Sequence, residues 1–247
     1  MLAREEKLIE IVRRLHEAAG DNLQSILLYG SAARGDYHTR KSDLNLLCLL
    51  KSAKASELAR IAKVVRWWSD EQQEPAPQIF TREELVRSAD VFAIELFDIA
   101  RHHKVLFGSD PVADIEVPLN LHRVQIEHEL RTALQKLRAH FLRYSEDEAR
   151  LRGVYEQSIS SVTTLLRHFL IALGEEADTE RARIYQRIQE LTGADADTFE
   201  LGHALRENHP VTEIARAYGK YLAAIETVIR SLDALVPKRE WQRIKKH

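Results

Sequence analysis

A short apolar run that ends in a Gly-Ser pair constrains the fold of this chain more than any other feature. Residues 23–29 are predicted to form a buried strand, which Gly30 and Ser31 end at the start of a short helix. Glycine lets a backbone approach a ligand closely, and free N–H groups at a helix N-terminus suit phosphate. Arg34 and Lys41 lie near enough in sequence to meet anionic oxygens. The turn is therefore a candidate phosphate-binding site.

A second strand is predicted over residues 43–50, after a charged loop. The two-residue period of a strand places Asp43 and Asn45 on one face. Leu44 and Leu46 then point to the other face. This is the layout expected for two metal ligands above a phosphate-binding turn.

The pattern of alternating strands and helices continues to about residue 107. Apolar residues at helical spacing predict a helix over residues 55–69, and an extended segment is expected at residues 78–80. Thr81 and Glu84 have the spacing of a capping box at the start of another helix. A further strand is predicted over residues 91–99. Such alternation favours an α/β layer architecture.

The second half of the chain has the pattern of an all-helical region. Residues 108–120 hold a glycine and two prolines with little periodicity, which predicts a domain boundary there. We therefore expect an α+β protein, with an α/β domain over residues 1–110 that contains a small mixed sheet and a helical bundle over residues 118–247. After a long helix that includes Val124 to Phe141, the predicted helices cover residues 148–173, 178–192, 195–207 and 211–235.

Composition excludes several classes of protein. Hydrophobic residues make up 45% and charged residues 30%, and the net charge of −2 indicates neither nucleic-acid binding nor membrane binding. Cys48 is the single cysteine, so an internal disulfide and a cysteine-based zinc site are excluded. No apolar stretch approaches the roughly 18 residues that span a bilayer. These observations predict a cytoplasmic protein.

Two pairs of histidines are interpreted as structural. His102 and His103 are adjacent, so their side chains diverge, and they are expected at the surface or in a turn. His122 and His128 lie among glutamates and are expected on a solvated helix face.

The segments 28–36, Leu-Tyr-Gly-Ser-Ala-Ala-Arg-Gly-Asp, and 42–46, Ser-Asp-Leu-Asn-Leu, together resemble the signature of the nucleotidyltransferase superfamily. That superfamily includes DNA polymerase beta and the aminoglycoside nucleotidyltransferases. Its pattern is Gly-Ser, a spacer, then an acid, an apolar residue and a second acid, with a third carboxylate on a later strand. Ser31 and Asp43 stand at the required separation. The resemblance covers about residues 20–107, and many members also carry a helical C-terminal domain.

The resemblance implies transfer of a nucleoside monophosphate from a nucleoside triphosphate (NTP) to an acceptor hydroxyl. Three carboxylates would hold two Mg²⁺ ions, which clamp the triphosphate and activate the acceptor. Asp43 would be the first metal ligand, and the position of Asn45 would be catalytic. Gly30 and Ser31 would hold the β- and γ-phosphates.

Two positions of this chain depart from the family's acidic triad. The second acid is replaced by Asn45, and the third position falls at Gln78. Mg²⁺ favours anionic oxygen ligands, so the loss of two carboxylates removes several kcal/mol of attraction at any plausible dielectric. Catalysis through this triad alone is not expected.

Glu95 and Asp98 are candidate substitute acids. They are three residues apart, so in the strand predicted there they would face opposite sides and only one could reach the site. The competing interpretation is an ion pair with a neighbour such as Arg34 or Arg101.

Two hypotheses remain open from the sequence. One is an Mg²⁺-dependent enzyme that transfers a nucleotide to an acceptor of unidentified kind. The other is a catalytically inactive protein of the same fold that binds a nucleotide or another ligand and acts through a partner. A nucleotide is expected as ligand in both, membrane association in neither, and a homodimer is left open.

Overall fold

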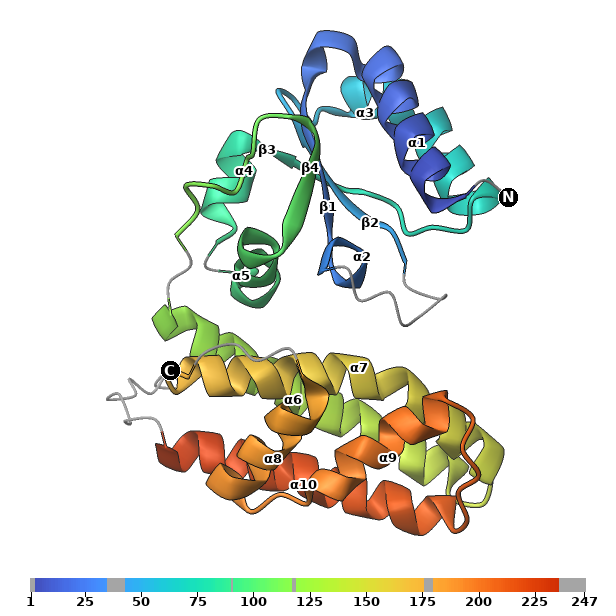
Figure 1. The fold of residues 1–247 in the computed structure, drawn as a ribbon, viewed down its shortest axis with the longest axis vertical. Coiled ribbons are helices and arrows are strands. Elements are labelled where there is room, and N and C mark those ends of the chain that lie inside the picture. Colours follow the sequence, from blue (N-terminus) through green and yellow to red (C-terminus); the bar gives the residue numbers. More distant parts are fainter. Residues whose placement is uncertain (1–2, 35–42, 90, 117–118, 176–179, 236–247) are drawn as a thin grey trace, which may run out of the picture. The chain divides into compact units, whose positions relative to one another are not determined.

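The structure is a computed structural model that describes residues 3–34, 43–89, 91–116, 119–175 and 180–235. The chain divides into two compact units, residues 1–121 and 122–247, and each is described by itself (Figure 1). The N-terminal unit combines helices with a sheet, and the C-terminal unit is helical. An α+β fold of this kind is what the sequence predicts.

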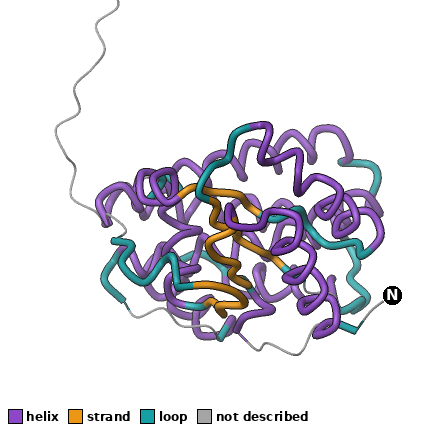
Figure 2. The backbone as a smooth tube through the Cα atoms, turned by 90° about the horizontal axis from the view of Figure 1, so that it is seen from above, coloured by secondary structure: helices purple, strands orange, loops and turns teal. Residues whose placement is uncertain are grey.

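The sheet of the N-terminal unit has four strands in the order β3-β2-β1-β4. Strand β1 pairs antiparallel with both β2 and β4, while β2 pairs parallel with β3, so the sheet is mixed. In Figure 2 the strands, drawn in orange, lie together. The strands are β1 (Leu23–Tyr29), β2 (Asn45–Leu50), β3 (Gln78–Thr81) and β4 (His103–Gly108).

Helices cover both faces of this sheet (Figure 1). On one face, helices α1 and α3 pack against β1 and β2 around the fully buried Trp68. On the other face, Leu27 and Leu47 pack against α4 and α5. The helical elements of this unit are α1 (Arg4–Ala19), η1 (Gly20–Asn22), α2 (Ser31–Arg34), α3 (Ala55–Arg66), the π-helical η2 (Trp67–Glu71), α4 (Arg82–Arg87) and α5 (Ala93–Arg101).

The prediction of a strand over residues 91–99 is wrong, because this segment forms helix α5. Leu96 and Ile99 lie at helical spacing and pack against the sheet, and Ala93, three residues before Leu96, is also buried. A short apolar run does not by itself distinguish a buried strand from a buried helix. The strand that the sequence did not reveal is β4, a partly exposed edge strand whose apolar run is only Val105-Leu106-Phe107.

The predicted capping box before α4 is confirmed. Thr81 accepts a hydrogen bond from the backbone N–H of Glu84, and the Glu84 carboxylate accepts one from the N–H of Thr81. The hydrogen bonds lower the pKa of the Glu84 carboxyl.

The helices predicted for the C-terminal unit are confirmed, with ends shifted by a few residues. Gly193 ends one of them in a left-handed conformation. Aromatic side chains fill the core, where the rings of Tyr155 and Tyr221 stack at 4.3 Å. The helices are α6 (Leu119–Tyr144), α7 (Glu148–Ala172), α8 (Arg181–Thr192), α9 (Ala196–Arg206) and α10 (Ile214–Leu235).

The expectation that His122 lies on a solvated face is wrong. His122 is fully buried, and its Nε2 lies 2.7 Å from Nδ1 of His168, which is also fully buried. His128 is exposed as expected.

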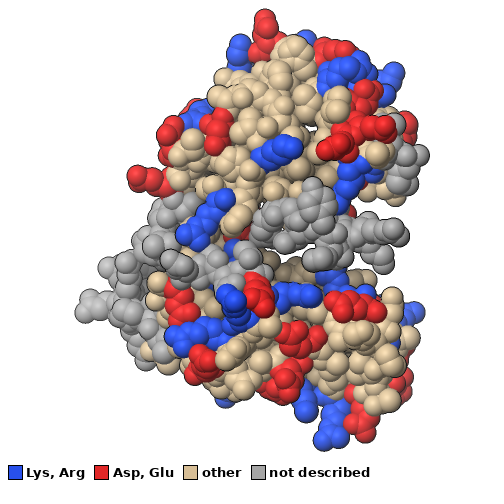
Figure 3. Space-filling model, in the orientation of Figure 1, with Lys and Arg blue, Asp and Glu red and all other residues tan. Residues whose placement is uncertain are grey.

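The surface agrees with the small net charge. On the face that Figure 3 shows, acidic and basic side chains are interspersed over each unit. Within the residues that the structure describes, no helix is both long and apolar enough to cross a bilayer.

The hydroxyl of Tyr155 provides a test of the helical core. It is buried and donates a hydrogen bond to the carbonyl oxygen of Thr198. Tyr155→Phe keeps the packed ring and removes this bond, so the free energy of unfolding should fall by about 1 kcal/mol. Urea denaturation measures the change, and Tyr144→Phe, on the partly exposed end of α6, should leave stability unchanged.

Candidate functional site

The turn after β1 has the geometry of a close backbone approach. Gly30 has φ +78°, in the left-handed region that favours glycine, and Ser31 begins α2. The N–H of Ala33 donates to the carbonyl of Gly30 at 3.1 Å, which closes the turn. A Cβ on Gly30 would lie 3.1 Å from Nδ2 of Asn45. The turn and the second predicted ligand position are therefore adjacent.

The start of β2 brings Asn45 beside β1. Asn45 pairs directly with Tyr29, the last residue of β1. Leu44 and Leu46 are buried against α1 and α3, whereas Asp43 is exposed and Asn45 is half-buried. The alternation of faces expected for residues 43–46 is therefore present, although β2 itself begins at Asn45.

Gln78 is the first residue of β3 and is exposed. It pairs with Leu47 in the parallel ladder, so it shares a face of the sheet with Asn45, two residues earlier on β2. The structure thus brings the two carboxamide positions onto one face of neighbouring strands.

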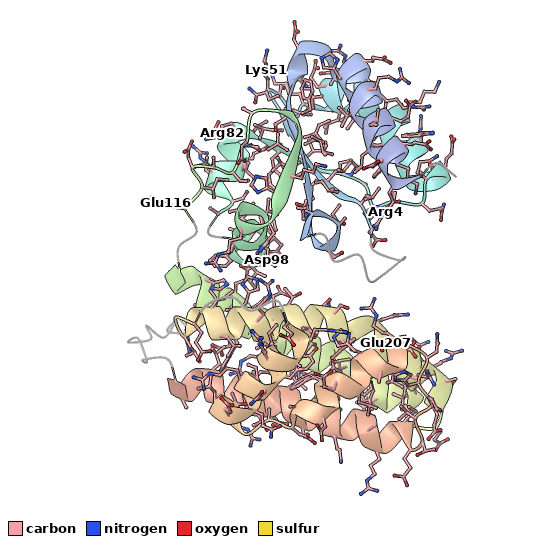
Figure 4. All side chains as sticks on the ribbon, viewed as in Figure 1. Arg4, Lys51, Arg82, Asp98, Glu116 and Glu207 are labelled. Atoms are coloured by element: carbon pink, nitrogen blue, oxygen red, sulfur yellow. The ribbon has the colours of Figure 1, made fainter. Side chains whose placement is uncertain are left out.

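Glu95 and Asp98 lie on helix α5 rather than on a strand, so the expectation that they face opposite sides is wrong. Three residues apart on a helix, they lie on one side of it. Burial, and secondarily the negative charge of Glu95, raise the pKa of Tyr29. Glu95 therefore lies within electrostatic range of the end of β1. Figure 4 shows Asp98 at the end of the N-terminal unit where α2 lies, with Lys51 at the opposite end.

The basic residues predicted to bind phosphate are not placed. Lys41 and the side chain of Arg34 lie outside the described residues. Arg101, a predicted partner of the acids, has its guanidinium carbon 4.9 Å from the ring centroid of Phe97.

The expectation that His103 lies at the surface or in a turn is wrong, because it begins strand β4 beside the candidate site and its side chain is only 14% exposed. It pairs with Tyr29 from β4, so Asn45, Tyr29 and His103 form a row across three strands. Its Nδ1 lies 2.7 Å from the carbonyl of Ile99, and its Nε2 lies 3.0 Å from a carboxylate oxygen of Asp110. The sequence would have indicated this position of His103 only if residues 103–108 had been recognised as a strand.

A surface hollow of 690 Å³ lies at the other end of β2 from Asn45, where Lys51, Lys54 and Arg82 contribute to its lining. Arg82 is engaged there, donating to the carbonyl of Pro111 at 2.8 Å. The hollow contains none of the predicted site residues.

The residues present do not fit a two-metal site held by protein carboxylates. Of the three predicted ligand positions, only Asp43 supplies a carboxylate, while Asn45 and Gln78 offer neutral amide oxygens. Within the described ranges, no group of three or more His, Cys, Asp or Glu side chains could hold a metal ion. Phosphate binding by the turn requires no such group.

Comparison with known proteins identifies the N-terminal part of the fold. Residues 5–101 match the family model of a nucleotidyltransferase domain. No curated protein matches the chain in sequence.

Solved structures with a similar backbone include the spectinomycin adenyltransferase AAD(9) from Enterococcus faecialis, crystallised with ATP and spectinomycin. It is 13% identical to this chain, with a TM-score of 0.60, and the match covers 94% of this chain and 100% of that one. At this identity the likeness shows the fold alone. A toxin–antitoxin structure with AMP-PNP, 20% identical over 44% of this chain and 76% of that chain, has a TM-score of 0.30, too low for a shared fold.

Proposed function

Because residues 5–101 form a nucleotidyltransferase domain, we propose that this protein binds a nucleoside triphosphate at the turn of Gly30 and Ser31. The observation that carries the proposal is the left-handed Gly30 at the start of α2, directly beside Asn45. Backbone N–H groups of such a turn hold phosphate oxygens without any acidic side chain. In this proposal the β- and γ-phosphates contact the turn, and Arg34 and Lys41 add positive charge.

The division of the chain supports separate roles for its two parts. We place the nucleotide in the domain of residues 1–110 and the contacts to an acceptor or partner in the helical domain of residues 118–247. The adenyltransferase of similar fold was crystallised with ATP and spectinomycin. By analogy with that pair of ligands, a small molecule is the first acceptor class to test.

Nucleotide transfer is the second candidate function, and the position of Glu95 favours it. Glu95 and Asp98 share one side of α5, and Glu95 acts electrostatically on Tyr29 at the end of β1. In this candidate an acceptor hydroxyl attacks the α-phosphorus and the bond to the β-phosphate breaks. Pyrophosphate leaves, and the hydroxyl proton passes to Glu95.

Calorimetry with ATP, with and without Mg²⁺, separates the two functions. If the protein only binds nucleotide, the affinity should change by less than about threefold when Mg²⁺ is removed, because the turn itself holds the phosphates. Asp43→Ala should then bind ATP nearly as well as the wild type. Pyrophosphate release measured with a panel of small-molecule acceptors should stay at background.

The alternative outcomes are distinct. Binding that requires Mg²⁺ and Asp43, together with pyrophosphate release, would establish the transferase instead. Absence of binding to each of ATP, GTP, CTP and UTP under both conditions would eliminate both functions.

A further inference from the structure

A buried ion pair links helix α1 to the segment that precedes β3. Lys7 is only 5% exposed, and its Nζ lies 2.6 Å from Oε1 of Glu74. The same ammonium group donates to the carbonyl oxygen of Gln72 at 2.8 Å. The side chain of Glu74 is 10% exposed, so both charges are largely removed from water.

The second carboxylate oxygen of Glu74 contacts the backbone next to the candidate site. Its Oε2 accepts a hydrogen bond of 2.9 Å from the N–H of Leu44. Leu44 follows Asp43 and precedes the first residue of β2, outside the ladder that holds the strand. The Glu74 carboxylate thus connects the backbone N–H that follows Asp43 to Lys7 of α1, which lies 67 residues from Glu74 in sequence.

The segment that carries Glu74 is itself held firmly. It leaves the π-helical turn η2 through Gln73, which has φ +59°. The indole Nε1 of the fully buried Trp68 donates to the carbonyl of Pro75 at 2.9 Å, and the N–H of Glu74 donates to the carbonyl of Trp68 at 3.3 Å. The carboxylate is therefore presented from a supported backbone.

We infer that Glu74 is a positioning residue, which acts through the N–H of Leu44 to hold the start of β2, with Asn45, against the Gly30 turn of the nucleotide site. This inference rests on the proposed function. A buried ion pair contributes little stability compared with apolar residues of the same volume, so stability alone does not account for it. Its geometry instead fixes the backbone of Leu44, which leads directly into Asn45 at the start of β2.

Two double variants without the buried charges test the inference. Lys7→Met with Glu74→Gln keeps an oxygen acceptor for the N–H of Leu44, whereas Lys7→Met with Glu74→Leu removes it. Neither variant leaves an unpaired buried charge. We expect ATP affinity near that of the wild type in the Gln variant and about tenfold weaker affinity in the Leu variant.

Amide hydrogen exchange at Leu44 provides a readout that does not depend on nucleotide. Protection should be lost in the Leu variant and kept in the Gln variant. The control is Ser25→Ala on β1, which removes a fully buried hydroxyl whose oxygen lies 2.7 Å from the carbonyl oxygen of Ser109 and 3.0 Å from that of Phe107. This control should lower stability without changing ATP affinity or exchange at Leu44.

The outcomes separate this inference from the proposed function. Equal ATP affinity in the two folded double variants would overturn the positioning role. If the wild type binds no nucleoside triphosphate, the proposed function fails, and amide exchange alone tests the contact of Glu74 with Leu44. Equal exchange at Leu44 in both variants would overturn that contact, and loss of protection in the Leu variant alone would support it.

Discussion

Gly30→Val should weaken ATP binding by about a hundredfold, measured by calorimetry on the folded variant. The backbone of Gly30 has φ +78°, and a β-branched residue there is strained. A Cβ would also lie 3.1 Å from Nδ2 of Asn45, so either the amide or the turn must move. If the turn relaxes to a negative φ, its N–H groups no longer converge on the phosphates.

The matched control is Gly193→Val in the helical unit. Gly193 has φ +74°, so the strain is similar, but a Cβ there would meet no atom of the described residues within 4 Å. This variant should lose about 1–2 kcal/mol of stability and keep the ATP affinity of the wild type. Equal ATP affinity in the two variants would contradict the assignment of the Gly30 turn to phosphate.

Restoring the acids by Asn45→Asp together with Gln78→Glu should raise Mg²⁺ affinity by about a hundredfold or more. Asn45 and Gln78 lie on one face of neighbouring strands, and Asp43 lies two residues before Asn45. At an effective dielectric of about 20, each added charge attracts a divalent cation by several kcal/mol before desolvation is subtracted. Calorimetric titration with Mg²⁺ measures the gain.

Two variants show whether the gain is local to the site. Gln24 lies near the first residue of β1, whereas Tyr29 is its last residue. Gln24→Glu therefore adds a charge at the other end of the strand and should leave Mg²⁺ affinity unchanged. Adding Asp43→Ala to the acid-restored protein should remove most of the gain, because three carboxylates become two. A gain that survives the loss of Asp43 would place the metal elsewhere.

The local features of the site could be predicted from sequence. Residues 23–29 form β1, Gly30 turns the chain, and Ser31 begins a helix, because each depends on neighbouring residues only. The capping box at Thr81 was predictable for the same reason. The assignments of Gly30, Ser31, Asp43, Asn45 and Gln78 to a nucleotide site remain predictions that the variants above test.

The tertiary structure decided the features that depend on packing. Helix α5 forms where a strand was predicted, because a short apolar run indicates burial but not the type of element. The helix is settled by packing, since Leu96 and Ile99, at helical spacing, contact one face of the sheet. That change also moved Glu95 and Asp98 onto one side of one element.

What the sequence determined by itself is the turn at Gly30–Ser31 and the order of most helices and strands, and it predicts that Asn45 and Gln78 stand at metal-ligand positions. What only the tertiary structure decided is which distant groups meet there, such as the Glu74 carboxylate and the N–H of Leu44, 30 residues apart. The physical reason is that periodicity and turn chemistry act over a few residues. A buried hydrogen bond between remote segments exists only once the surrounding core has packed.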